Sequence, residues 1–126
     1  MRILIIDDDP MLVRLMRAML QSGMDGEIAI ASAGSREAAE ELFGMLGPRG
    51  RPDIVLCDRE LPDGVGEDII ASMRTFEALR DVPVLGVTAS DDAKTHEKLV
   101  RAGALLVLTK SALRSQLLDV IRQHAA

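Results

Sequence analysis

Short apolar runs alternate with amphipathic stretches along the whole chain, and this alternation constrains the fold more than any other feature. Most of the runs are apolar throughout and too short for helices, which is typical of strands buried on both faces of a sheet. The stretches between them carry apolar residues at helical spacing. The sequence therefore predicts an α/β fold, in which five helices cover both sides of a five-stranded parallel sheet. The predicted strands cover residues 2–6, 27–31, 53–57, 82–87 and 104–108.

The amphipathic stretches carry signals for the ends of helices. Asp9-Pro10 predicts the start of the first helix, because Asp caps free N–H groups and Pro fits the first helical turn. Ser35 opens the second predicted helix, and Gly103 ends the fourth. The third, fourth and fifth helices are expected through residues 69–79, 93–101 and 113–121.

Composition limits the class of protein. A chain of 126 residues with 48% hydrophobic residues is of the size of one domain, so we expect residues 1–126 to form a single domain. A net charge of −5 argues against direct nucleic-acid binding, and the lack of Tyr and Trp argues against a base-stacking surface. No apolar run reaches the roughly 18 residues of a membrane span. The single cysteine, Cys57, is compatible with a reducing cytoplasm.

Polar side chains follow four of the five predicted strands. Because the carboxyl ends of parallel strands meet at one edge of a sheet, we expect these side chains to converge there. Three acids follow the first strand, one acid follows the third, a hydroxyl follows the fourth, and a lysine lies just beyond the fifth. These residues are Asp7, Asp8, Asp9, Asp58, Thr88 and Lys110.

Carboxylates gathered in this way require a cation or a proton. Like charges a few ångströms apart repel by several kcal/mol at an intermediate dielectric. Oxygen ligands without His or Cys suit Mg²⁺, which readily shares its coordination shell with a phosphate. Lys110 and Thr88 would add a positive charge and a hydroxyl donor for the oxygens of a transferring phosphoryl group. Asp58, which stands alone in the middle of the sheet, is the candidate nucleophile.

Four motifs in this order make the chain similar to the receiver domains of two-component response regulators, including chemotaxis receivers. ILIIDDDP resembles the family's first strand and acidic pair, and DIVLCDRELPDGVG resembles its phosphoacceptor strand and the loop that follows. VLGVTAS resembles the strand with the hydroxyl, and AGALLVLTK the strand with the lysine. The resemblance implies a flavodoxin-like, doubly wound sheet with the strand order 2-1-3-4-5.

The resemblance also implies a Mg²⁺ site. By position, Asp8 is the direct ligand, and Asp7 acts mainly through water. Asp58 and the backbone carbonyl of Glu60 complete the set of protein ligands.

The same resemblance implies phosphoryl transfer to Asp58 from a phosphohistidine on a sensor histidine kinase or a histidine phosphotransfer protein. Thr88 would then bind a phosphoryl oxygen, and Lys110 would pair with Asp58 before transfer and with the phosphoryl group after it. The output expected is a change of the face formed by the fourth helix, fifth strand and fifth helix, with a homodimer through this face as one outcome.

Three departures from the family pattern concern the readout of the phosphoryl group rather than the site. Val107 stands where many receivers have Tyr or Phe, so an aromatic swing is not available. Ser111 replaces the usual proline after Lys110, so the family's cis peptide would cost about 2.5–4 kcal/mol, and the loop must bear strain or take another path. Leu105 and Leu106 make the last strand unusually apolar.

Two other functions remain open from the sequence. An aspartate-nucleophile phosphohydrolase of the haloacid-dehalogenase type would use the Asp-x-Asp pattern of Asp7 and Asp9, but it needs a further acidic pair beyond the lysine. A receiver-like binding module that does not depend on phosphate would fit the missing aromatic residue and the missing proline. The two histidines, His96 and His124, lie on predicted helix surfaces without ligand spacing, and we assign no role to them.

Overall fold

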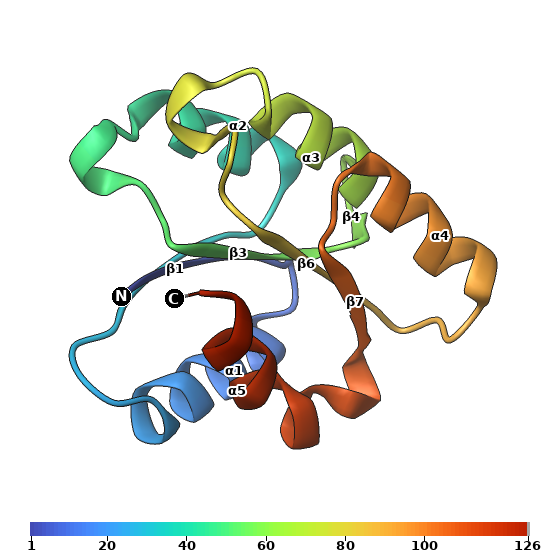
Figure 1. Ribbon diagram of the computed structural model, residues 1–126. Helices are drawn as coiled ribbons and strands as arrows, with labels where there is room; N and C mark the ends of the chain where they lie inside the picture. Colours follow the sequence, from blue (N-terminus) through green and yellow to red (C-terminus); the bar gives the residue numbers. More distant parts are fainter. Residues whose placement is uncertain (126) are drawn as a thin grey trace.

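The computed structural model describes residues 1–125, and a five-stranded parallel sheet forms its centre (Figure 1). The spatial order of the strands is β2-β1-β3-β6-β7. Counted among these five strands alone, this is the order 2-1-3-4-5, which confirms the predicted fold. The strands are β1 (Arg2–Ile6), β2 (Ala29–Ala33), β3 (Ile54–Asp58), β6 (Val84–Thr88) and β7 (Leu106–Thr109).

Helices cover both faces of the sheet. Two helices, α1 (Pro10–Gly23) and α5 (Leu113–His124), lie on one face (Figure 1). The other face is covered by α2 (Arg36–Met45), α3 (Gly66–Met73) and α4 (Ala93–Ala102). Three short 3-10 turns at Pro48–Gly50, Glu77–Leu79 and Lys110–Ala112 complete the connections.

Among residues 1–125, no helix combines the length and the apolar character that a membrane crossing requires.

The sheet separates two apolar layers, as strands buried on both faces require. Alternate side chains of β1 point to opposite faces, so Ile3 and Ile5 pack with α1 and α5. Leu4 and Ile6 pack with the other three helices, and all four side chains are at most 2% exposed. This double burial explains why the strand sequences lack a polar face.

The three helix ends that were predicted from capping or terminating residues are all found in the structure. Asp9 Oδ1 accepts hydrogen bonds from the N–H groups of Met11 (3.0 Å) and Leu12 (3.4 Å) at the start of α1. Ser35 caps α2. Gly103 ends α4 with φ at 123°, in the region that L-residues with side chains rarely adopt.

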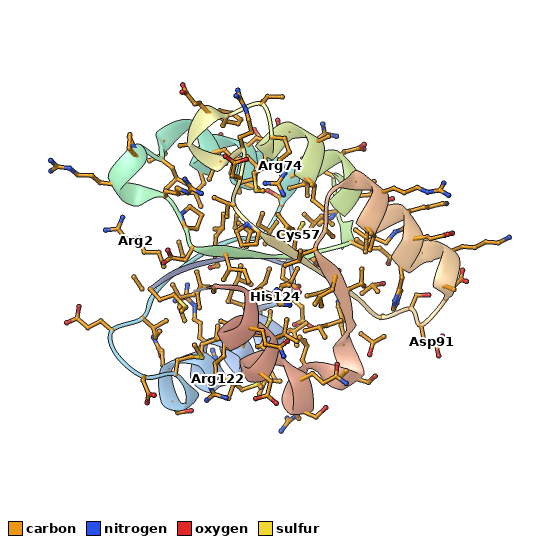
Figure 2. The ribbon with its side chains drawn as sticks, viewed as in Figure 1. Arg2, Cys57, Arg74, Asp91, Arg122 and His124 are labelled. Carbon is orange, nitrogen blue, oxygen red and sulfur yellow. The ribbon has the colours of Figure 1, made fainter. Side chains whose placement is uncertain are left out.

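The boundaries of the other elements differ from the prediction. The last four strands begin and end one or two residues later than their apolar runs suggested, because pairing with the neighbouring strand sets the ends of the ladder. For example, pairing of β2 begins at Ala29, which lies opposite Arg2. The third predicted helix ends at Met73 rather than continuing to Leu79. Arg74, labelled in Figure 2, donates to the carbonyl oxygens of Leu79 (3.0 Å) and Val82 (2.7 Å), and the chain turns around its guanidinium.

A small hairpin follows β3 where the sequence predicted only a turn. Its two strands are β4 (Glu60–Leu61) and β5 (Gly64–Val65). The Asp63 carboxylate, in the turn between them, accepts from the backbone N–H groups of Arg36 (2.7 Å) and Glu37 (3.0 Å). These N–H groups stabilise the ionised carboxylate and lower the pKa of Asp63. The hairpin is therefore tied to the first turn of α2.

Candidate functional site

The strand register places the predicted site residues at one edge of the sheet. Asp7 follows β1 directly, Asp58 ends β3, Thr88 ends β6, and Lys110 follows β7. Asp58 lies opposite Val87 in the ladder, and Thr88 lies opposite Thr109. Asp58 and Thr88 are thus the last residues of their strands, whereas the sequence predicted that each would directly follow its strand.

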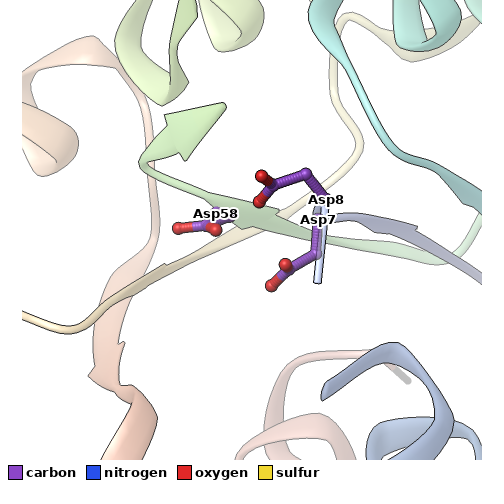
Figure 3. A group of neighbouring side chains, drawn as sticks. All are labelled: Asp7, Asp8 and Asp58. Atoms are coloured by element: carbon purple, nitrogen blue, oxygen red, sulfur yellow. The ribbon is translucent and has the colours of Figure 1, made fainter. Parts of the chain in front are cut away.

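Three carboxylates from two segments meet at this edge. Oxygen atoms of Asp7, Asp8 and Asp58 all lie within 4.8 Å of one another (Figure 3). Asp7 and Asp58 are buried, with 4% and 3% of their surface exposed, whereas Asp8 is exposed. Asp7 Oδ1 accepts from the N–H of Asp9 at 2.9 Å, but its buried Oδ2 has no hydrogen-bond partner. An unpartnered carboxylate oxygen in such a cluster is a ready ligand for a cation.

Burial and mutual repulsion disfavour the ionised forms of the buried acids. Burial raises the pKa of Asp7 to about 6, and the negative charge of Asp58 adds to this effect. Burial also raises the pKa of Asp58, although the N–H of Glu60 and the ammonium of Lys110 act in the opposite direction. A divalent cation would remove this electrostatic cost by neutralising the carboxylates together.

The donor set fits a hard divalent cation. All three side chains offer carboxylate oxygens, which Mg²⁺ prefers over nitrogen or sulfur ligands. The backbone of Glu60 lies beside them, because its N–H donates to Asp58 Oδ1 at 3.2 Å. The side chain of Glu60 is exposed, and its Oε1 lies 3.8 Å from a guanidinium nitrogen of Arg59.

Lys110 is the cation that the chain itself supplies. Its Nζ donates to Asp58 Oδ2 at 3.2 Å, and a third of its side chain is exposed. Burial opposes the charged ammonium, but the nearby charge of Asp58 and the hydrogen bond to it prevail and raise the pKa of Lys110. Peptide bonds are trans throughout residues 1–125, including the bond between Lys110 and Ser111. The loop therefore avoids the costly cis peptide, and the chain forms a 3-10 turn at Lys110–Ala112 instead.

Thr88 presents a hydroxyl at the same edge. The residue is buried, and its Oγ1 accepts from the N–H of Ser90 at 3.1 Å. A hydroxyl that accepts one hydrogen bond keeps its own proton for another acceptor. Thr88 can therefore donate to an oxygen atom bound at Asp58.

An ion pair that sequence reasoning missed closes the base of the hairpin. Arg59 Nε lies 3.2 Å from Glu67 Oε1, and each side chain is about one-fifth exposed. The backbone of Arg59 is held as well, since its N–H donates to Val87 O (2.9 Å) and its carbonyl accepts from the N–H of Gly66 (2.7 Å). No local sequence pattern joins residues 59 and 67, because their contact depends on the path of the hairpin.

Two neighbours of the cluster take no part in it. Asp9 uses its carboxylate to cap α1. Cys57, labelled at the centre of Figure 2, is fully buried in β3, and burial, followed by the charge of Asp58, raises the pKa of its thiol to about 12. The thiol is therefore protonated at neutral pH and is not a nucleophile.

The raised pKa of Asp7 predicts a pH dependence of stability in metal-free protein. Between pH 3.8 and about 6 the native state holds a proton that the unfolded chain has released. The free energy of unfolding should therefore fall as the pH rises through this window, by up to about 3 kcal/mol for a shift of this size. Urea unfolding followed by far-UV circular dichroism measures it, since the chain has no Trp or Tyr.

Asp7→Asn is the control for this pH dependence. The neutral amide cannot titrate, so the variant should lose most of the decline and be more stable than the wild type at pH 7. A decline of the same size in Asp7→Asn would show that other groups cause it.

Comparison with known proteins gives one consistent family. A sequence model of the response regulator receiver domain matches residues 3–122. A probable C4-dicarboxylate response regulator of Halalkalibacterium halodurans is 32% identical over 124 residues, which are 98% of this chain and 50% of that protein. The polar-differentiation response regulator DivK of Brucella anthropi is 23% identical over 97% of this chain and 94% of its own length. The chain spans about half the length of the first relative and of a rice two-component response regulator.

Solved structures agree with the family match. The BeF3-activated N-terminal receiver domain of RstA from Klebsiella pneumoniae is 25% identical, with a TM-score of 0.83 over 99% of this chain and 98% of that one. The receiver domain of a sensor histidine kinase from Pseudomonas aeruginosa is 26% identical, with a TM-score of 0.82 over 98% and 96%. The latter structure has a magnesium ion coordinated in its active-site cleft.

Proposed function

Because the chain belongs to the response regulator receiver domain family, we propose that it accepts a phosphoryl group on Asp58 from a phosphohistidine, with Mg²⁺ bound at the acidic edge of the sheet. The observation that carries this proposal is the Asp58 carboxylate itself. It lies in a cluster with two further acids and receives a hydrogen bond from Lys110. One carboxylate, a cation site and an ammonium are together the groups that phosphoryl transfer to an acid requires.

In the proposed reaction, an oxygen atom of Asp58 attacks the phosphorus atom of the donor. A P–O bond forms as the P–N bond breaks, the bonding electrons stay with the imidazole nitrogen, and that nitrogen takes up a proton. Lys110 orients the Asp58 carboxylate before transfer and pairs with a phosphoryl oxygen afterwards, while the Thr88 hydroxyl donates to another oxygen. These groups offset the negative charge on the transferring phosphoryl group.

Asp7, Asp8, Asp58 and the carbonyl of Glu60 are the residues proposed to hold Mg²⁺. When bound, the ion supplies positive charge to phosphoryl oxygens and relieves repulsion among the acids. The fit rests on the buried, unpartnered Asp7 Oδ2 and on the all-oxygen donor set. The partner implied is a sensor histidine kinase or a histidine phosphotransfer protein.

The phosphohydrolase alternative lacks support at Asp9. That reading needs both acids of the Asp-x-Asp pattern in the site, whereas Asp9 is occupied in capping α1. The phosphate-independent module is supported by Val107 at the position of the usual aromatic residue and by Ser111 at the position of the usual proline. An experiment on phosphoryl uptake separates all three.

The test is intact-mass spectrometry after incubation with phosphoramidate and Mg²⁺. The proposal predicts a gain of one phosphoryl group that is lost in acid and does not form in EDTA. A module that does not depend on phosphate would show no gain. A hydrolase would release phosphate continuously and carry the label on Asp7.

We also propose that the face formed by α4, β7 and α5 mediates self-association after phosphorylation. Val100, in α4, and Leu105, directly before β7, are large apolar side chains that are each 49% exposed. Beryllofluoride with Mg²⁺, a stable phosphoryl mimic, should increase the mass measured by light scattering. Leu105→Ser should prevent this increase, and an unchanged mass of the wild type would refute the proposed dimer.

A further inference from the structure

The imidazole of His96 is engaged with the loop that leaves the site. His96 is in the first turns of α4 and is partly buried. Its Nε2 lies 2.8 Å from the carbonyl oxygen of Ser90. Because a carbonyl oxygen only accepts, Nε2 must carry the proton and donate.

Ser90 thereby joins α4 to the site hydroxyl. Its N–H donates to Thr88 Oγ1 (3.1 Å), and its carbonyl accepts from His96. Its own Oγ accepts from the N–H of Asp92 (3.1 Å), the residue that caps α4. A continuous chain of hydrogen bonds therefore runs from Thr88 through Ser90 to His96.

A phosphoryl group on Asp58 would act on the first link of this chain. Thr88 would donate its hydroxyl proton to a phosphoryl oxygen, while its Oγ1 accepts from the N–H of Ser90. If Oγ1 moves toward that phosphoryl oxygen, Ser90 either follows it or loses this hydrogen bond. In the coupling inferred here, this displacement passes to the Ser90 carbonyl that His96 holds.

The helix at the far end of this chain is lightly anchored. Leu99 is the one buried residue of α4, whereas α3 has four, including Ile69, Ile70 and Met73. An element with few buried contacts shifts at low free-energy cost. Val107, which pairs with Gly86 in the ladder, has no polar side-chain group, so it cannot form a hydrogen bond that changes with the phosphoryl state of the site.

We propose that His96 is a positioning residue that couples the phosphoryl state of Asp58 to α4 through Ser90, in the place of an aromatic reporter. This inference rests on the proposed function. The side chain touches neither the phosphoryl group nor the cation, and it acts by holding the Ser90 carbonyl.

The test uses imidazole and amide NMR on the labelled full chain with Mg²⁺ and beryllofluoride. The chain has two histidines, so the imidazole spectrum contains two spin systems, and His124 is an internal control at the end of α5. Figure 2 shows His124 well apart from Asp91 in the loop after β6. The spectra are recorded in the Leu105→Ser background, in which the proposed dimer does not form, and there the mimic should shift the His96 ring signals and leave those of His124 in place.

Two variants separate coupling from folding. In His96→Ala, the amide of Ser90 should still respond to beryllofluoride, while the response of the α4 amides is lost. His96→Gln should restore the α4 response, because the Gln amide nitrogen lies at about the position of Nε2 and can donate to the same carbonyl. Thermal unfolding of both variants identifies any general loss of structure, which Gln and Ala would share.

The outcomes are distinguishable. If fluorine NMR shows beryllofluoride bound at the site but the His96 ring does not respond, or the α4 response is unchanged in His96→Ala, the coupling is wrong and the proposed function stands. If beryllofluoride does not bind the wild type, the proposed function fails, and the coupling fails with it.

Discussion

Asp58→Asn is expected to abolish the acid-labile phosphoryl group completely. The amide has no free carboxylate oxygen to attack phosphorus, and no other acid of the cluster receives a hydrogen bond from Lys110. Asn nearly matches the shape of Asp and removes one buried charge, so the variant should fold. Intact-mass spectrometry after incubation with phosphoramidate and Mg²⁺ measures the effect.

Asp7→Asn is the informative comparison for this loss. It should still accept a phosphoryl group, although more slowly, because the nucleophile is intact and the cation site is weakened. Label that survives in Asp58→Asn and is located on Asp7 would favour the phosphohydrolase instead and would contradict our assignment of the nucleophile.

Asp8→Asn is expected to weaken Mg²⁺ binding by at least about 10-fold, since a carboxylate and a cation attract by several kcal/mol at an intermediate dielectric. Asp8 is the exposed member of the cluster, so its loss removes a ligand without disturbing buried packing. Isothermal titration calorimetry measures the affinity directly.

Asp9→Asn is a matched control for Asp8→Asn. It removes the same charge one residue away, and Asn also caps helices well, so α1 should begin at the same place. Its Mg²⁺ affinity should stay close to that of the wild type. Equal losses in the two variants would mean that net charge, rather than coordination, governs the affinity.

Much of the fold could be predicted from the sequence because burial on both faces leaves a strong local signal. Runs such as Arg2–Ile6 are apolar throughout, and Asp9 and Ser35 carry their capping chemistry at the helix starts. The strand order came from the resemblance to receiver domains and not from the alternation itself. Exact strand ends were less accurate, because they depend on pairing, as between Arg2 and Ala29.

The positions of the site residues were predictable for a related reason. Parallel strands bring their carboxyl ends to one edge, so Asp7, Asp58 and Lys110 could be expected together from the order of the runs. The contacts that support the site were not predictable in this way. The Arg59–Glu67 ion pair and the His96–Ser90 hydrogen bond join segments whose separation is set by loop paths.

The most direct test of the account is a crystal structure of the chain with Mg²⁺ and beryllofluoride. We expect the beryllium atom on an oxygen of Asp58, Mg²⁺ coordinated by Asp8, Asp58 and the carbonyl of Glu60, and Lys110 and Thr88 in contact with the fluorine atoms. Beryllofluoride bound at another residue, or Mg²⁺ held away from these acids, would contradict the central claim that this edge of the sheet accepts a phosphoryl group.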